Sequence, residues 1–194
     1  DYLTYLKSFR YALSGEFAME TSILKDMRVP SDWGLEIGVL SEAYRNLNGR
    51  RICQVDIANN YDHKHQPLSE NDANAGLSRM SRDISKALFR KLAIQGVVFQ
   101  KETFRTLKAT YYRTALDLID SYYAVATMNG LALDRNAEER AVELFATNVA
   151  EAGAQFLETP VETPLIPNWT RIESADPDIM NRLKTAVQAD ASIA

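Results

Sequence analysis

Beyond residue 68, the apolar residues of this chain recur at intervals of three and four, and this period constrains the fold more than any other feature. Three successive stripes show it: Leu77, Met80, Ile84, Leu88 and Leu92; Phe104, Leu107, Tyr111, Leu118 and Tyr122; Val142, Phe145, Val149, Ala152 and Phe156. Such spacing places the apolar side chains on one face of an α-helix, whereas a strand repeats every two residues. Most of the chain is therefore expected to be helical.

Capping signals predict where these helices begin. Ser69-x-x-Asp72 and Asn136-x-x-Glu139 resemble capping boxes ahead of the first and third stripes. Asp176-Pro177 is expected to start a terminal helix, since proline suits the first helical position. The proline-rich stretch 159–169 is expected to cross between helices in an extended form.

The first third of the chain has a mixed pattern. Helical spacing is expected near the N-terminus, over 19–27 and over 35–47, with Ser31 or Asp32 as the cap of the third. The β-branched run 51–57 predicts a buried strand, with another near Leu13. The predicted fold is therefore α/β over 1–92, followed by a mainly α-helical extension over 93–194. One or two strands cannot form a stable sheet, so the rest of the sheet is expected upstream of Asp1.

Composition excludes several classes of function. The net charge of −4 and the pI near 5.3 argue against nucleic-acid binding, which needs a clustered basic surface. The single cysteine, Cys53, cannot form an internal disulfide and is expected to be buried, which favours a reducing, cytoplasmic location. No apolar run reaches about 18 residues, so no membrane span is predicted.

Both histidines of the chain lie in one polar segment, His63-Lys64-His65, after the predicted strand. In an extended segment their imidazoles share a face and could bind zinc together, as in a metal hydrolase. One histidine could instead complete a metal site whose carboxylates come from elsewhere. As a third alternative, both are solvated loop residues.

Two glycine–glutamate motifs are further candidates for a binding site. Glu36 lies between Gly34 and Gly38, at the start of a predicted helix, where a carboxylate is favoured by the helix dipole. The two glycines weaken that helix by about 1 kcal/mol each, which suggests that a ligand or another backbone passes close. Gly15-Glu16 follows the same pattern after a predicted turn, where the acid caps a helix or binds a hydroxyl.

Four motifs in series resemble a known family: Leu13-Ser14-Gly15-Glu16-Phe17-Ala18, Trp33-Gly34-Leu35-Glu36-Ile37-Gly38, Gln54-Val55-Asp56 and His63-Lys64-His65-Gln66-Pro67-Leu68. In this order they resemble the C-terminal half of the retaining glycosyltransferases that make glucosyl-3-phosphoglycerate. The resemblance implies a GT-A fold, a UDP- or GDP-hexose donor, a divalent Mg²⁺ or Mn²⁺ ion and a 3-phosphoglycerate-like acceptor. The Asp-x-Asp metal motif of that fold is expected upstream, outside this chain.

The resemblance also assigns roles to residues. It makes Glu36 the catalytic acid that binds donor-sugar hydroxyls and His63 the metal ligand. The remaining donor- or acceptor-binding candidates are Gly15, Glu16, Trp33, Gly34, Tyr61, His65 and Gln66. Tyr61, His65 and Gln66 depart from the family's residues, which leaves the nucleotide and acceptor preferences open.

The helical extension is expected to build a subunit interface. Tyr111, Tyr112, Tyr122 and Tyr123 put aromatic side chains on more than one helical face, which favours a homodimer over packing on a single side. The alternative function is a non-catalytic helical interaction module in which the histidine segment is structural.

Overall fold

The computed structural model describes residues 1–57, 66–161 and 165–192. In this part of the chain the regular elements are helices: α1 (Tyr2–Lys7), α2 (Thr21–Asp26), α3 (Leu35–Asn46), the 3₁₀ turn η1 (Gly49–Arg51), α4 (Gly76–Ile94), α5 (Lys101–Met128), α6 (Arg135–Glu158), α7 (Trp169–Ala175) and α8 (Ile179–Ala191). The three stripes of the sequence lie in α4, α5 and α6. The prediction that most of the chain is helical is confirmed.

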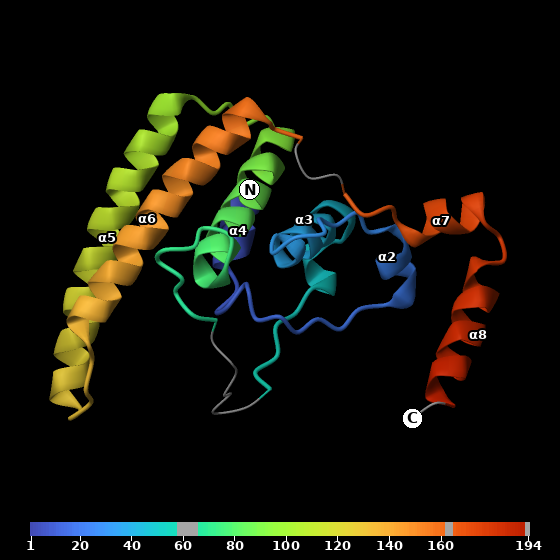
Figure 1. The fold of residues 1–194 in the computed structure, drawn as a ribbon, viewed down its shortest axis with the longest axis horizontal. Coiled ribbons are helices and arrows are strands. Elements are labelled where there is room, and N and C mark those ends of the chain that lie inside the picture. The colour runs from blue at the N-terminus through green and yellow to red at the C-terminus, as the bar shows by residue number, and fades with distance from the viewer. Residues whose placement is uncertain (58–65, 162–164, 193–194) are drawn as a thin grey trace.

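The long helices form one side of the molecule. Figure 1 shows α5 and α6 as an antiparallel hairpin, with α4 packed beside α6. Their shared core is aromatic and consists of Phe89, Phe104, Ala152 and Phe156, with Phe99 packed against it. The rings of Phe89 and Phe104 are 4.9 Å apart, a separation at which tilted aromatic pairs attract each other beyond simple area burial.

The middle of the molecule is built on α3, which packs against α4 on one side and against α1 on another. Tyr2 of α1 is fully buried and its hydroxyl donates to the backbone carbonyl of Ile37 at 3.2 Å. Burial raises the pKa of Tyr2. Because that hydrogen bond ends on the first turns of α3, it anchors this helix where the candidate site begins.

The α7 end of the chain returns to the first third of the sequence. Helix α7 packs on α2, and Leu165 forms an isolated antiparallel bridge with Pro30. Figure 1 shows α8 extending from α7 away from the rest of the molecule. This return sets residues far apart in sequence next to the loop that precedes α3.

The predicted α/β fold class is wrong for this chain. No β-strand is found among the residues that the structure describes: 52–57 are extended, and η1 occupies the start of the predicted strand. An extended segment becomes a strand only when another backbone pairs with it, and within the described chain 53–57 make no backbone–backbone hydrogen bond. Val55 and Ile57 are consequently 72% and 64% exposed, and Cys53 is exposed rather than buried as predicted.

Helix positions were predicted better than helix starts. The helices expected near the N-terminus, over 19–27 and over 35–47 are present. The cap predictions at Ser69 and Asn136 are wrong: α4 starts after Ala75, and α6 is capped by Asp134, whose side chain accepts from the Ala137 amide. Helix α8 likewise starts after Asp178, two residues later than Asp176-Pro177 predicts.

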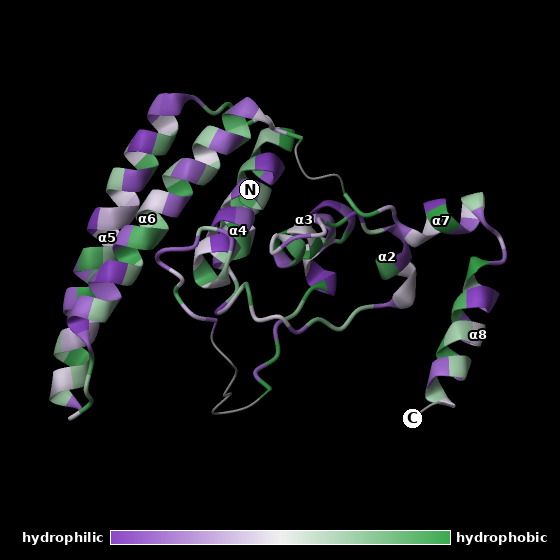
Figure 2. Cartoon of the chain, in the orientation of Figure 1, coloured by the Kyte–Doolittle hydropathy of each residue, from purple (hydrophilic) through white to green (hydrophobic). Residues whose placement is uncertain are grey.

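Apolar and polar residues alternate around the long helices, as Figure 2 shows. Among the described residues, no helix combines the length and the apolar character that crossing a membrane requires. The expected boundary at residue 92 falls in the last turn of α4, a helix that packs on both α3 and α6. The two parts expected from the sequence therefore share this helix.

Candidate functional site

The structure brings the two glycine–glutamate motifs together. Gly15 has φ +82, in the left-handed region that favours glycine, and its backbone turns toward the first turn of α3. A Cβ placed on Gly15 would lie 3.4 Å from Oε1 of Glu36. The Glu36 carboxylate therefore lies against the Gly15 turn, although 21 residues separate the two in the sequence.

This contact changes the electrostatics of Glu36. Burial raises the pKa of its carboxyl above the ordinary value, and the charge of Glu16 raises it further. Because the Glu16 charge disfavours ionisation of Glu36, a ligand that donates hydrogen bonds to the Glu36 carboxylate would be stabilised there. In a sugar, hydroxyl groups are such donors.

Helix α3 positions Glu36 through its N-terminal turn. The N-cap residue of α3 is Gly34, which has no side-chain capping bond, and its amide donates to the Asp32 carboxylate at 2.8 Å. The predicted cap at Ser31 or Asp32 is therefore wrong, because α3 begins after Gly34. Glu36 occupies the first turn of α3, as predicted, where the helix dipole favours a negative charge.

The glycines around Glu36 have packing partners inside the chain. A Cβ on Gly34 would overlap the Cβ of Ala87 on α4, and a Cβ on Gly38 would overlap the ring of Pro30. Another part of the same chain therefore passes close at both positions, which was one of the two explanations that the sequence allowed. Gly34 is buried by this packing.

The other predicted site residues are placed less centrally. Trp33 is 43% exposed at the start of α3, next to the Gly15–Glu36 contact in sequence, and Gln66 is exposed. Tyr61, His63 and His65 lie outside the described residues. The structure therefore assembles the glycine–glutamate part of the predicted site.

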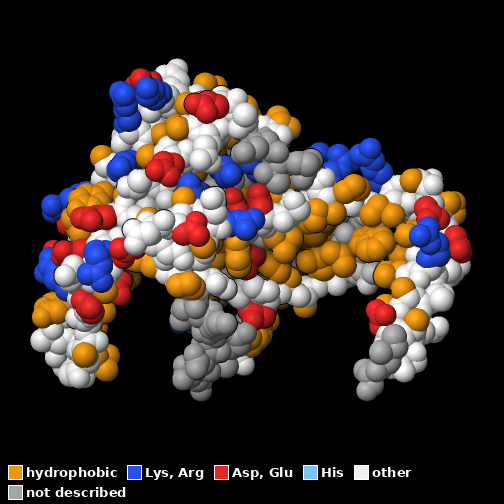
Figure 3. Space-filling view, viewed as in Figure 1, with side chains coloured by type: hydrophobic (Ala, Val, Ile, Leu, Met, Phe, Trp, Pro, Cys, Tyr) orange, Lys and Arg blue, Asp and Glu red, His pale blue; other side chains and the backbone are white. Residues whose placement is uncertain are grey.

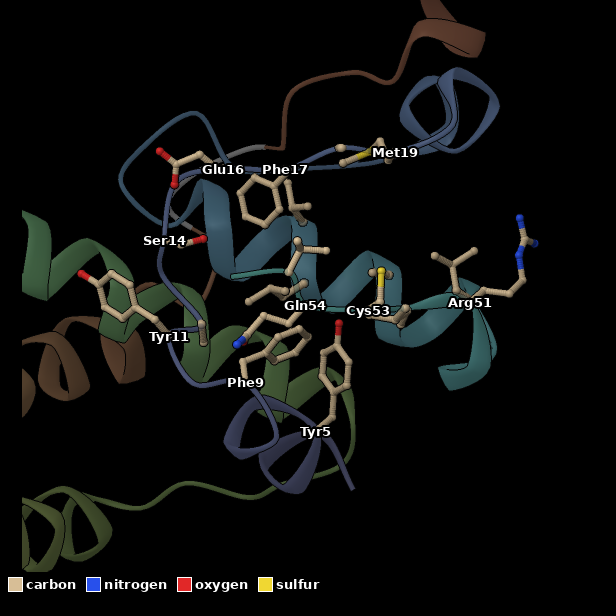
Figure 4. Close-up of a pocket in the computed structure, with 18 of the residues that line it drawn as sticks. Tyr5, Phe9, Tyr11, Ser14, Glu16, Phe17, Met19, Arg51, Cys53 and Gln54 are labelled. Carbon is tan, nitrogen blue, oxygen red and sulfur yellow. The ribbon is translucent and has the colours of Figure 1, made fainter. Parts of the chain in front are cut away.

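A large cavity adjoins this part of the site. Its volume is about 1030 Å³, and its walls come from residues 9–20, from 51–57 and from the faces of α2 and α3 that point toward them. Figure 4 shows Phe9 and Phe17 directed into it, while the carboxylate of Glu16 points outward at its edge. The interior is mostly apolar, and its polar groups lie toward the two extended segments.

A polar contact that the sequence analysis did not anticipate ties these two segments together. The Arg10 amide donates to the Gln54 side chain at 2.8 Å, and the Arg10 guanidinium pairs with Asp56 at 2.9 Å. Gln54 and Asp56 belong to one of the motifs that carry the family resemblance. Polar residues alternating within an apolar run were the available signal, but their partner Arg10 could not be read from spacing.

Tyr5 also lines this cavity. Figure 4 shows its hydroxyl directed toward Cys53 and Gln54. That oxygen is buried and has no hydrogen-bond partner among the described residues, and burial raises the pKa of Tyr5. A buried hydroxyl without a partner costs about 1–3 kcal/mol, so a polar group entering here would be favoured.

Side chains that could bind a metal ion do not cluster in the part of the chain that the structure describes. Over 1–57, 66–161 and 165–192, no three His, Cys, Asp or Glu side chains come together to hold an ion. The predicted ligand His63 falls in the segment 58–65, outside those ranges. The expected Mg²⁺ or Mn²⁺ site therefore stays a prediction.

Comparison with known proteins identifies the relatives of the chain. A glucosyl-3-phosphoglycerate synthase of Persephonella marina is 44% identical over 191 residues, and one of Methanococcoides burtonii is 40% identical over 191 residues. Each match covers 98% of this chain but only 47% and 46% of those proteins, so the chain spans about half the length of the curated relatives it matches. No model of a known protein family matches the chain. No solved structure matches it.

By sequence, then, the chain is a relative of enzymes that join a sugar to a phosphorylated acid. It is homologous to about half of a glucosyl-3-phosphoglycerate synthase, and the resemblance carried by its four motifs is confirmed. The 191 matched residues span both α3 with Glu36 and the long α4–α6 helices.

Proposed function

We propose that this chain supplies the sugar-donor side of a metal-dependent retaining glycosyltransferase, which moves glucose from a nucleotide sugar to 3-phosphoglycerate. The contact of Glu36 with the Gly15 turn carries the proposal. It unites two motifs of the family resemblance in one place, next to a cavity of about 1030 Å³. The names of the two relatives support the acceptor and the sugar.

In this proposal Glu36 accepts hydrogen bonds from donor-sugar hydroxyls. Burial, and after it the charge of the neighbouring Glu16, raise the pKa of Glu36. When hydroxyl hydrogens point at the Glu36 carboxylate, they stabilise its charged form, and such charge-assisted bonds are worth about 1.5–3 kcal/mol each. Sugar binding and ionisation of Glu36 then favour each other.

The divalent ion of this proposal would neutralise charge on the leaving nucleotide diphosphate. His63 is its proposed protein ligand, because the family resemblance places the ligand immediately before Lys64. A neutral imidazole can bind Mn²⁺ or Mg²⁺ at neutral pH. A His63→Ala variant should lose metal dependence while His65→Ala retains it, and the reverse result would refute this assignment.

We further propose a homodimer formed through the far end of the α5–α6 hairpin. Large apolar side chains lie exposed there: Leu118, Tyr122, Tyr123, Val125, Met128 and Leu131. Tyr122 and Met128 are 61% and 85% exposed, more than a helix packed on both faces allows. A second copy of the same hairpin is the occupant we propose, since closed two-fold assemblies are the commonest.

The decisive experiment measures glucose transfer by the intact synthase that contains this sequence. Reactions with UDP- or GDP-glucose, 3-phosphoglycerate and Mg²⁺ or Mn²⁺ should yield glucosyl-3-phosphoglycerate. Glu36→Gln should lower kcat/KM by roughly one to two decades, which corresponds to the loss of one charge-assisted contact.

A matched control comes from α5. Glu102, like Glu36, is an acid in the first turn of a helix. It is exposed on α5 and belongs to neither of the two glycine–glutamate motifs. Glu102→Gln should leave kcat/KM within twofold of wild type. Equal activity of Glu36→Gln and Glu102→Gln would refute the role proposed for Glu36.

A further inference from the structure

The segment Leu165–Ala175, which we call the strap, runs across the residues that precede the Glu36 turn. Its first contacts are with the loop before α3: Leu165 bridges to Pro30, and the Ile166 amide donates to the Val29 carbonyl at 2.9 Å. This loop connects α2 to α3, so the strap contacts it midway between the two helices. Figure 1 shows α7 beside α2 at the end of this crossing.

Side-chain contacts fasten the strap to the end of α2. The Asn168 side-chain amide donates to the Asp26 carbonyl at 3.2 Å, and the Thr170 hydroxyl donates to the Asp26 carboxylate at 2.6 Å. The Lys25 ammonium pairs with Glu173 at 2.9 Å. Three side-chain contacts therefore hold the strap to the last turn of α2, and two of them end on Asp26.

Pro30 transmits this attachment to α3. Its ring lies where a Cβ on Gly38 would be, and its Cγ lies 3.4 Å from the corresponding point on Gly34. Gly34 and Gly38 flank Glu36 on the first turn of the helix. If Pro30 moved away from α3 together with the strap, space would therefore open beside the turn that carries Glu36.

We propose that the strap is a positioning element for Glu36, with Asn168 and Thr170 as the residues that hold it. It acts through Asp26 and Pro30 and makes no contact with the sugar in this proposal. The inference rests on the proposed function only for the role of Glu36 in binding the donor sugar. The contacts that link the strap to α3 are those of this chain, whatever Glu36 binds. It assigns a role to a segment that lies some 130 residues away from Glu36 in sequence.

The link is tested by amide hydrogen exchange on the chain with Asn168→Ala and Thr170→Val combined. The reporters are the Leu35 and Gly38 amides, which donate to the Asp32 and Gly34 carbonyls in the first turn of α3. The double variant removes both bonds to Asp26 and also the α7 cap, in which the Asn168 side chain accepts from the Arg171 amide. This loss should loosen the strap and raise exchange at these reporters by about tenfold. The control is Ser174→Ala, which removes only a bond within α7, to the Thr170 carbonyl.

Two outcomes decide the proposal. If exchange rises over 165–175 while the Leu35 and Gly38 amides stay within twofold of wild type, the strap does not position α3 and the inference is wrong. If the reporters respond, the intact synthase carrying the same variant should show a KM for the nucleotide sugar raised about three- to tenfold, with kcat changed less. If exchange at the Leu35 and Gly38 amides rises but the KM for the nucleotide sugar is unchanged, the strap does position α3. The donor-binding role of Glu36 is then refuted instead.

Discussion

Replacing Gly34 by alanine tests whether this glycine is required for packing or for a ligand. The backbone at Gly34 has φ −76 and ψ 2, which alanine adopts without strain, so any effect arises from the added methyl group. That Cβ would overlap the Cβ of Ala87 and lie 2.9 Å from the Asp32 carboxylate. Asp32 can rotate away, but Ala87 is 2% exposed on α4 and its methyl group is fixed to the helix backbone.

The expected changes in the free energy of unfolding come from the two residues in this contact, Gly34 and Ala87. Overfilling a packed helix contact costs about 1–3 kcal/mol, so Gly34→Ala should lower the free energy of unfolding by about 2 kcal/mol. Ala87→Gly alone should cost about 2 kcal/mol, from lost helix propensity and one lost buried methyl group. In the double variant one methyl group replaces the other, and only about 1 kcal/mol of propensity loss remains. The coupling free energy should therefore be about 3 kcal/mol in favour of the double variant.

The assay is urea unfolding of the four proteins of this cycle, followed by circular dichroism. Gly49→Ala is the matched control, because a Cβ there meets nothing within 4 Å and should leave the stability within about 0.5 kcal/mol. Additivity of Gly34→Ala and Ala87→Gly within about 0.5 kcal/mol would refute the packing explanation. The glycine would then be explained by the approach of a ligand, as the family resemblance implies.

Burial and the Glu16 charge raise the pKa of Glu36 above 4.5, so its neutral form stabilises the fold at low pH and this contribution is lost as the pH rises. The stability of Glu36→Gln relative to wild type should therefore increase above pH 4.5. A stability difference that does not change with pH would contradict this prediction. Lys91→Met removes the ammonium that lies 3.8 Å from the buried Glu42 carboxylate, and leaving that charge unpaired should cost about 3 kcal/mol in urea unfolding. A second change, Glu42→Gln, should restore part of this stability. A loss under about 1 kcal/mol would show that the pair is hydrated. Gly153→Ala would drive a methyl group into the Phe104 ring and should cost about 1–3 kcal/mol, whereas a stability equal to that of Gly49→Ala would show that the ring yields. Light scattering of the intact protein should give a dimer mass, and a monomer would refute the α5–α6 interface.

The sequence alone determined most of the helical architecture. The stripes within α4, α5 and α6 are local patterns, since residues three and four apart face the same side of any helix regardless of what that side packs against. The helical turn that carries Glu36 was predicted for the same reason, from the helical period over 35–47. Helix starts were predicted less well, because Asp134 is as good a cap as Asn136 and α4 begins after Ala75, which has no capping side chain. The chain around these positions decides where each helix begins.

Tertiary structure decided whether residues 51–57 would form a strand. The β-branched run has the propensity for one, but a strand also needs a second backbone at hydrogen-bonding distance, and among the described residues none pairs with it. The exposure of Cys53 follows from the same cause, because its neighbours Val55 and Ile57 are left uncovered. Figure 3 shows how much apolar surface remains on one face of the molecule.

For the candidate site, too, the sequence determined one part and the tertiary structure the other. Its residue types were visible in the sequence, and the resemblance to a family linked them in order. Their meeting was decided by the fold: Gly15 reaches Glu36 only because the turn at φ +82 directs the chain onto α3, and Pro30 fills the space that Gly34 and Gly38 leave open. Contacts between residues distant in sequence depend on the path of the whole chain, so no local pattern of spacing or propensity could determine them.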